Sequence, residues 1–191
     1  MNYRLLVNKT NGLSKDFIPE YLVDTKSKYK DGILINEKVL NAFRNLQNDA
    51  RELNYYFDIE SGYRSYEYQE KIYNEIVREK GFNYALRSVA KPGYSEHQTG
   101  LAIDICIYKD GKSYIEHDIE DYPETKWLHT NAHKYGFILR YPKDKEEITG
   151  YMYEPWHLRY VGDISLYIYN NNLTLEEYYN EKTILNENNK V

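Results

Sequence analysis

The segment that follows Asn36 shows a helical spacing of apolar residues. Apolar side chains recur there every three or four positions, so they would fall on one side of a helix and leave the other side polar. Asn36 suits the N-cap, because its side chain can accept a hydrogen bond from a backbone N–H of the first turn. The predicted buried stripe consists of Val39, Leu40, Phe43, Leu46, Ala50 and Leu53.

A second helix is predicted between Ser65, a capping residue, and Gly81, which suits the position just past a helix end. Its spacing gives a second inward-facing stripe. The residues expected on that stripe are Tyr68, Ile72, Tyr73, Ile76 and Val77. Further helices are expected at 123–135 (closed by Gly136), 165–170 and 174–182.

Strands are expected mainly between these helices. The run 101–108 is predicted to be a strand, and Asp110-Gly111 after it is typical of a hairpin turn. Shorter strands are expected at 55–59, 137–141 and 150–153. The order of elements predicts an α+β fold, with a small antiparallel sheet and flanking helices.

The predicted strand 101–108 contains one carboxylate, Asp104, among apolar residues. Alternation along a strand places it on the face of the small residues Ala102 and Cys106, with the bulkier apolar residues on the other face. A carboxylate in such a strand is costly unless it is paired or binds a metal. The alternative to a metal is a salt bridge to an arginine such as Arg140 or Arg159.

Candidate partners for Asp104 lie in two other segments. His97 precedes it in a loop, and Gly100 allows a sharp turn between the two. Glu154 and His157 are three residues apart, which permits both to reach one site from a tight turn. Two imidazoles and one carboxylate suit zinc, and three protein ligands leave a fourth position open for water. A spare glutamate beside such a metal can take the proton of that water.

Arg64 lies at the predicted junction between a strand and a helix. Binding and catalytic groups are often found on such loops. A guanidinium there could hold a substrate carboxylate or stabilise an oxyanion, and the alternative is an ordinary surface arginine.

Three other histidines and the single cysteine have less specific surroundings. His129 and His133 are four residues apart on a predicted helix, but Thr130 stands where the His-Glu-x-x-His zinc pattern has glutamate. They are expected on a packing or solvated face, and His117, in an acidic stretch, at the surface. Cys106 lies in an apolar run, which favours a buried structural thiol.

Composition narrows the functional class. The chain has 191 residues, which is most simply one domain. Its formal net charge is −5, and the basic residues are scattered, which argues against nucleic-acid binding. No segment approaches a membrane span, and the beginning of the chain does not read as a signal peptide. The expected location is the cytoplasm, or outside the cell if a leader has been removed.

The candidate residues fall in three separated motifs, which are Ser-Gly-Tyr-Arg-Ser at 61–65, Ser-x-His-x-x-Gly-x-Ala-x-Asp at 95–104 and Glu-Pro-Trp-His at 154–157. These motifs resemble those of the zinc D-alanyl-D-alanine carboxypeptidases of the VanY type. The resemblance covers roughly 55–162, the motif core of one expected catalytic domain, 1–191. It implies a Hedgehog/DD-peptidase-like fold.

The resemblance also implies roles for individual residues. One zinc ion per chain would be held by His97, Asp104 and His157, with Glu154 as general base and then acid. Arg64 would polarise the scissile carbonyl or stabilise the oxyanion. Ser95 and Gln69 would help to hold the peptide terminus.

The implied substrates are peptidoglycan precursor peptides that end in D-Ala-D-Ala. Leu-x-Asn-Lys near the start and Thr-Leu-Glu-Glu-Tyr near the end are similar to the VanXY class, which also splits free D-Ala-D-Ala and acts in vancomycin resistance. One alternative is an L,D-carboxypeptidase that trims tetrapeptides. A second is a zinc-binding module without catalytic activity, as in Hedgehog domains, and a purely structural protein would leave Asp104 unexplained.

Overall fold

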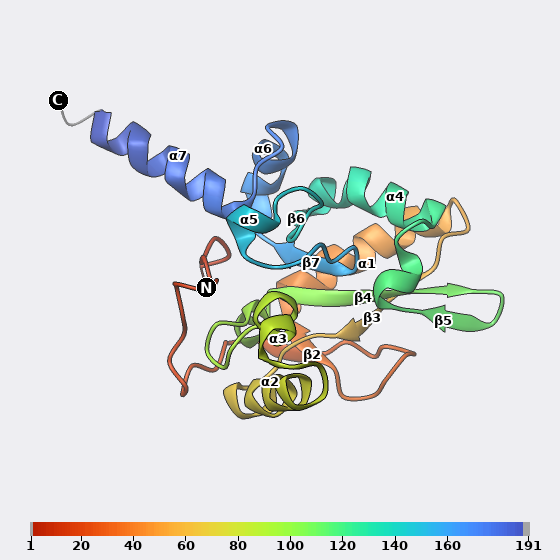
Figure 1. Ribbon diagram of the computed structural model, residues 1–191. Coiled ribbons are helices and arrows are strands. Elements are labelled where there is room, and N and C mark those ends of the chain that lie inside the picture. The colour runs from red at the N-terminus through yellow and green to blue at the C-terminus, as the bar shows by residue number, and fades with distance from the viewer. Residues whose placement is uncertain (1, 189–191) are drawn as a thin grey trace.

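The computed structural model describes residues 2–188, with side chains as far as residue 183. Its centre is a five-stranded antiparallel sheet built around β4 (Ala102–Lys109) (Figure 1). On one side β4 pairs with β3 (Phe57–Ser61), and on the other with β7 (His157–Tyr160), which pairs in turn with β6 (Phe137–Leu139). A hairpin joins β4 to β5 (Lys112–Tyr114), and β1 (Leu22–Asp24) and β2 (Leu34–Asn36) form a separate pair.

Helices flank this sheet, so the predicted α+β architecture is confirmed. In Figure 1, α1 (Glu37–Arg51) lies behind the sheet, α2 (Tyr66–Lys80) and α3 (Phe82–Ser88) lie together below it, and α4 (Pro123–Asn131) lies above. The remaining helices are α5 (Glu146–Thr149), α6 (Ser165–Asn170) and α7 (Leu175–Asn188). Short 3₁₀ turns are η1 (Glu96–Thr99), η2 (Glu116–Ile119), η3 (Ala132–Tyr135) and η4 (Gly162–Ile164).

Helix α1 forms where the spacing predicts it. Asn36 caps it by accepting a hydrogen bond from the Lys38 N–H at 3.0 Å. The expected stripe is buried as far as Ala50, but Leu53 is 50% exposed. The prediction for Leu53 is wrong because the helix ends at Arg51, and the chain turns away through Asn54 at a φ of 60°.

Strand β4 has the two different faces that the sequence predicts. Leu101 just before the strand and Ile103, Ile105 and Ile107 within it enter the main core with α1. Asp104 points the other way, towards a cleft lined partly by α2. Cys106 is fully buried as expected, and burial raises the pKa of its thiol to about 12.

Helix α2 also begins and ends as predicted, with Ser65 Oγ accepting from the Tyr68 N–H at 3.2 Å and Gly81 following at a φ of 86°. Its inward face differs from the prediction, because Tyr68 is exposed and the buried residue is Gln69. The physical reason is that α2 forms one wall of a cleft rather than covering the core.

The segment after α4 departs from the prediction in one element. The expected helix 123–135 forms as α4 followed by η3, and Gly136 ends it in the left-handed region at a φ of 86°. The strand expected at 150–153 is wrong, since Gly150 ends α5 and the next residues form a loop. Its tyrosines suggest a strand, but the Tyr151 ring packs against Tyr141 at 4.9 Å instead of joining a sheet.

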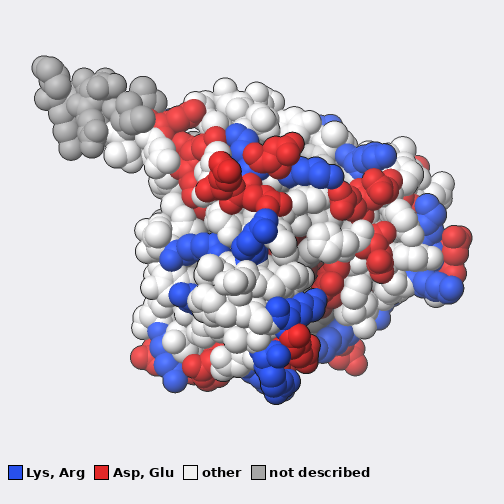
Figure 2. Space-filling view, viewed as in Figure 1, with Lys and Arg blue, Asp and Glu red and all other residues white. Residues whose placement is uncertain are grey.

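Basic and acidic side chains are intermixed over the face shown in Figure 2. Among the described residues, no helix has both the length and the apolar character needed to cross a bilayer.

The contrast between Phe43 and Leu53 gives a test of the core boundary. Phe43→Ala should lower the free energy of unfolding by about 3–5 kcal/mol, because the ring is buried and packs edge-on against Phe137. Leu53→Ala should change it by less than about 0.5 kcal/mol. Denaturant-induced unfolding measures both, and a loss at Leu53 equal to that at Phe43 would place Leu53 in the core.

Candidate metal centre and active site

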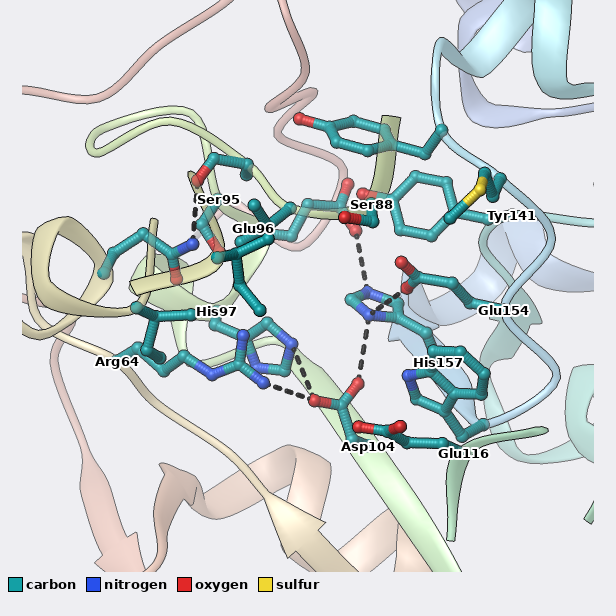
Figure 3. A pocket seen from close by; sticks show the side chains of 18 of the residues that line it. Arg64, Ser88, Ser95, Glu96, His97, Asp104, Glu116, Tyr141, Glu154 and His157 are labelled. Carbon is teal, nitrogen blue, oxygen red and sulfur yellow. Dashed lines mark hydrogen bonds and ion pairs between the residues drawn. The ribbon is translucent and has the colours of Figure 1, made fainter. Parts of the chain in front are cut away.

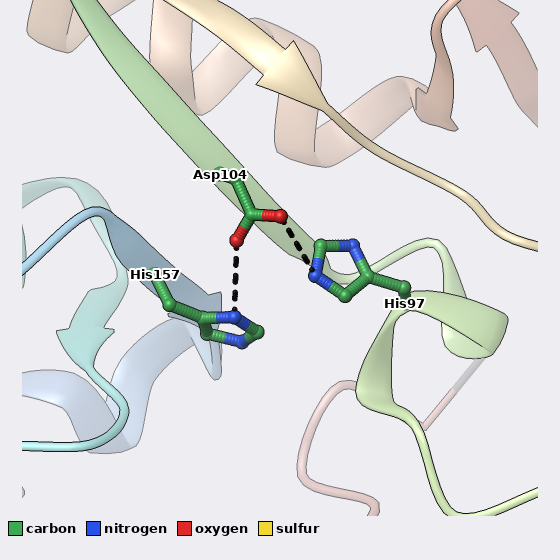
Figure 4. A group of neighbouring side chains, drawn as sticks. All are labelled: His97, Asp104 and His157. Carbon is green, nitrogen blue, oxygen red and sulfur yellow. Dashed lines mark ion pairs between the residues drawn. The ribbon is translucent and has the colours of Figure 1, made fainter. Parts of the chain in front are cut away.

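Three side chains from separate elements meet at one end of the sheet. Asp104 comes from the middle of β4, His157 is the first residue of β7, and His97 lies in η1. The antiparallel register pairs Asp104 with His157, and side chains opposite each other on paired strands point to the same face. One ligand atom from each residue lies within 4.8 Å of the others, and all three residues are buried (Figure 4).

The carboxylate of Asp104 lies between the two imidazoles. Its Oδ2 is 3.2 Å from His97 Nε2, and its Oδ1 is 3.1 Å from His157 Nδ1. Oδ1 is buried and has no hydrogen-bond partner among the described residues. A buried carboxylate oxygen that faces ring nitrogens and lacks a hydrogen-bond partner is suited to bind a cation. Two imidazole nitrogens and a carboxylate oxygen fit zinc.

A backbone carbonyl sets the orientation of His97. Gly62 O accepts a hydrogen bond from His97 Nδ1 at 2.7 Å, which leaves Nε2 as the nitrogen that faces Asp104. Gly62 is required here, because a Cβ atom at this position would lie 2.4 Å from Leu34 O. The glycine of the Ser-Gly-Tyr-Arg motif therefore lets the chain pass close to β2 and present its carbonyl to the imidazole.

Glu154 lies in the turn just before β7. Its Oε2 is 3.4 Å from His157 Nδ1, the nitrogen that also faces Asp104. The turn is closed by a backbone hydrogen bond from the His157 N–H to Glu154 O. Burial and the charge of Asp104 raise the pKa of Glu154 to about 8, although the charge on His157 acts in the opposite direction. A carboxylate with a raised pKa at the edge of a metal site is suited to proton transfer.

Arg64 is held at the site rather than at the surface. Its Nη2 lies 2.5 Å from Asp104 Oδ2, and Ser61 Oγ accepts from its Nε and Nη2 at 3.0 and 2.8 Å. Asp104 therefore does form a salt bridge to an arginine, as the alternative to a metal supposed, but the partner is Arg64 and not Arg140 or Arg159. The Arg64 side chain is 19% exposed and lines the cleft beside the metal-site residues (Figure 3).

Ser95 and Gln69 line the same cleft and are both buried. The amide nitrogen of Gln69 donates to Ala90 O at 2.8 Å, while its oxygen has no hydrogen-bond partner in the part of the chain that the structure describes. The structure thus brings all seven candidate site residues to one cleft. Apolar side chains of α2 form another part of the wall, with Glu60, Glu116 and His117 also at its surface.

Glu96 is a site residue that sequence reasoning missed. Its Oε1 accepts from Arg140 Nε at 2.8 Å and from Arg159 Nη1 at 2.7 Å, and all three side chains are fully buried. Burial alone would raise the pKa of Glu96, but the two guanidinium groups hold it well below its usual range. The signal in the sequence that could have identified Glu96 is its position directly before His97, within the motif at 95–104. Arg140 and Arg159 were already candidate partners for a buried carboxylate.

The other histidines lie outside the metal-ligating group. His129 Nε2 donates to Pro155 O at 2.8 Å and so supports the turn that carries Glu154. His133 stacks on Tyr169, which confirms a packing role. His117 is exposed as expected, but its ring also contacts the edge of Trp156, so it lies at the rim of the cleft.

Comparison with known proteins agrees with this geometry. The family model described as "VanY: D-alanyl-D-alanine carboxypeptidase" matches residues 32–163. The chain is 43% identical over 184 residues to the putative carboxypeptidase YodJ of Bacillus subtilis (strain 168), covering 93% of this chain and 67% of that protein. It is 38% identical over 181 residues to the bifunctional D-Ala-D-Ala dipeptidase and D-Ala-D-Ala carboxypeptidase VanXYC of Enterococcus gallinarum, covering 94% of each. A D-alanyl-D-alanine carboxypeptidase of Enterococcus faecium is longer, and this chain covers 47% of it.

Solved structures are similar over most of their length. The L,D-carboxypeptidase LdcB has a TM-score of 0.84 at 42% identity, with 92% of this chain and 84% of that chain covered. A mutant of the vancomycin resistance D,D-pentapeptidase VanY in complex with Zn(II) has a TM-score of 0.78 at 37% identity, with 94% and 99% covered. The resemblance seen in the motifs is therefore confirmed. The chain belongs to the VanY family of D-alanyl-D-alanine carboxypeptidases and is a hydrolase of the peptidoglycan peptidase class.

Proposed function

We propose that this chain is a zinc-dependent D,D-carboxypeptidase that removes the terminal D-alanine from peptidoglycan precursor peptides ending in D-Ala-D-Ala. The observation that carries the proposal is the convergence of His97, Asp104 and His157 within 4.8 Å at the floor of a cleft, with Glu154 next to them. Support for zinc comes from this donor set and from the related VanY mutant structure, which is described as a complex with Zn(II).

His97, Asp104 and His157 would hold the zinc, which would act as a Lewis acid towards the scissile carbonyl and the attacking water near neutral pH. Glu154 accepts one proton from the attacking water and delivers it to the departing D-alanine amine. Its carboxylate suits this task, because it lies on the same side of His157 as Asp104 and faces the cleft.

Arg64 supplies a fixed positive charge next to these groups. Because Ser61 holds its guanidinium from one side, the group is oriented before a substrate arrives. We assign to Arg64 the role of stabilising the carbonyl oxygen of the substrate, which becomes negative when water attacks. Gln69 and Ser95 are assigned to the peptide terminus, and the unpartnered Gln69 oxygen can accept a peptide N–H.

Free D-Ala-D-Ala is a second proposed substrate. The bifunctional enzyme VanXYC is matched over 94% of both chains, so the two proteins have similar extents. The competing candidate is an L,D-carboxypeptidase acting on tetrapeptides. It is favoured by the similarity to LdcB, which has a TM-score of 0.84 and 42% identity.

Glu154→Gln should reduce kcat about 10²–10⁴-fold while zinc stays bound, because the amide keeps the shape of the side chain but cannot accept the proton. Turnover of D-Ala-D-Ala peptides and zinc content of the purified protein measure the two effects. His157→Ala is the matched control, and it should lose both zinc and turnover. Wild-type activity in Glu154→Gln would remove Glu154 from the mechanism.

Product analysis decides the substrate. Free D-Ala-D-Ala, a UDP-linked pentapeptide and a tetrapeptide are each incubated with the protein, and released D-alanine is measured with and without a chelator. We expect release from the pentapeptide, its loss with the chelator and its return when Zn²⁺ is added back. Release from the tetrapeptide alone would support the L,D-carboxypeptidase, and release that resists complete removal of the metal would contradict the zinc mechanism.

A further inference from the structure

A cluster of buried charges lies directly behind the candidate metal centre. Arg140 donates to Glu176 through both terminal nitrogens, at 2.9 and 2.6 Å, and through Nε to Glu96. Arg159 also donates to Glu96, and the exposed fraction of each of these four residues is no more than 9%. The two guanidinium charges are thus balanced by two carboxylates within the cluster.

One edge of this cluster faces the metal centre. Both arginines bind the same oxygen of Glu96, Oε1, so the other oxygen, Oε2, is free to face His157. Oε2 lies 3.7 Å from His157 Nε2, which is an ion-pair contact rather than a hydrogen bond. Among the described residues, neither of these two buried atoms has a hydrogen-bond partner. These two unsatisfied atoms therefore face each other across 3.7 Å.

The two histidines of the centre use opposite ring nitrogens. His97 has its Nδ1 fixed by Gly62 O, and its Nε2 faces Asp104. His157 turns its Nδ1 to Asp104 and Glu154, and within the described ranges no backbone carbonyl accepts a hydrogen bond from its Nε2. Glu96 faces the ring nitrogen of His157 that points away from Asp104, just as the Gly62 carbonyl faces the corresponding nitrogen of His97.

We propose that Glu96 is a positioning residue for His157. Its carboxylate keeps the ring proton on Nε2, and this leaves the lone pair of Nδ1 directed at the site shared with Asp104. A metal-bound imidazole generally donates its other N–H to a carboxylate or a carbonyl, which fixes both tautomer and ring orientation. This inference rests on the proposed zinc site, and it adds a residue to which the sequence motifs gave no role.

The arginines explain how Glu96 can act in this way. Arg140 and Arg159 both donate to Oε1 of Glu96, and these two contacts fix the carboxylate so that Oε2 is the oxygen facing His157. Buried ion clusters of this kind add little stability compared with apolar packing. A role in fixing the orientation of Glu96 therefore accounts better for the presence of this cluster than a stabilising role does.

Zinc affinity of two matched variants tests the proposal. Glu96→Gln and Glu176→Gln each remove one negative charge from the same cluster without changing the shape of the side chain, but only Glu96 faces His157. Glu96→Gln should raise the zinc dissociation constant about 10–100-fold, and Glu176→Gln should change it by less than about threefold. Competition with a chromophoric chelator measures both constants, and unfolding curves of the metal-free variants report the cost to the fold.

Equal zinc affinity in Glu96→Gln and Glu176→Gln would overturn the proposal. If wild type itself binds no zinc, or if His157→Ala binds zinc as tightly as wild type, the proposed metal site fails instead. The two failures are therefore distinguishable without any measurement of activity.

A measurement on the wild-type chain covers the case in which Glu96→Gln does not fold. Nitrogen-15 NMR of the zinc-loaded protein assigns the ring nitrogens of His157, with His157→Ala identifying its signals. We expect a protonated Nε2 and a metal-bound Nδ1. A protonated Nδ1, or a metal-bound Nε2, would overturn the assignment of Glu96.

Discussion

The pairing of β4 with its two neighbours is the constraint on which the site depends. It places His157 opposite Asp104 on one side and Ser61 opposite Asp104 on the other. Because paired residues point to the same face of a sheet, the register of β4 with β7 brings together a carboxylate and an imidazole. A shift in the register of β3 between Ile59 and Ser61 adds the hydroxyl that holds Arg64. A slip of one residue would turn Asp104 into the apolar core, so the fold and the metal centre require the same alignment.

The charges around this alignment are unevenly balanced. Glu96 is fully compensated by two arginines, and Asp104 is partly compensated by Arg64. Glu154 has no arginine within ion-pair distance among the described residues, and burial raises its pKa to about 8. Positive charge is thus in short supply on the side where Asp104 and Glu154 both face His157. A divalent cation would supply it there, which is an argument for a metal independent of the sequence motifs.

Local physics made much of the fold and the special position of Asp104 predictable from the sequence, and the resemblance in the motifs supplied the roles of the other site residues, such as Gln69 and Ser95. The helix caps at Asn36 and Ser65 were predictable because capping depends only on a few neighbouring residues. Asp104 was identified because it is a carboxylate within an apolar strand. The strand expected at 150–153 failed because aromatic composition suits both a sheet and a packed loop. The partners of Arg140 could not be predicted, because pairing across 44 and 36 positions depends on tertiary contacts that neither periodicity nor spacing contains.

The buried cluster also shows what the two ends of the chain contribute. The family model matches 32–163, yet Arg140 is held by Glu176 of α7, and Arg159 Nη2 donates to Leu5 O at 2.6 Å. Asn8 reaches the same Glu176 carboxylate at 3.2 Å. A chain reduced to the matched region would leave buried guanidinium N–H groups without these acceptors, and that costs far more than the loss of a surface contact. Acceptors for the two buried guanidinium groups therefore lie on both sides of the region that the family model matches.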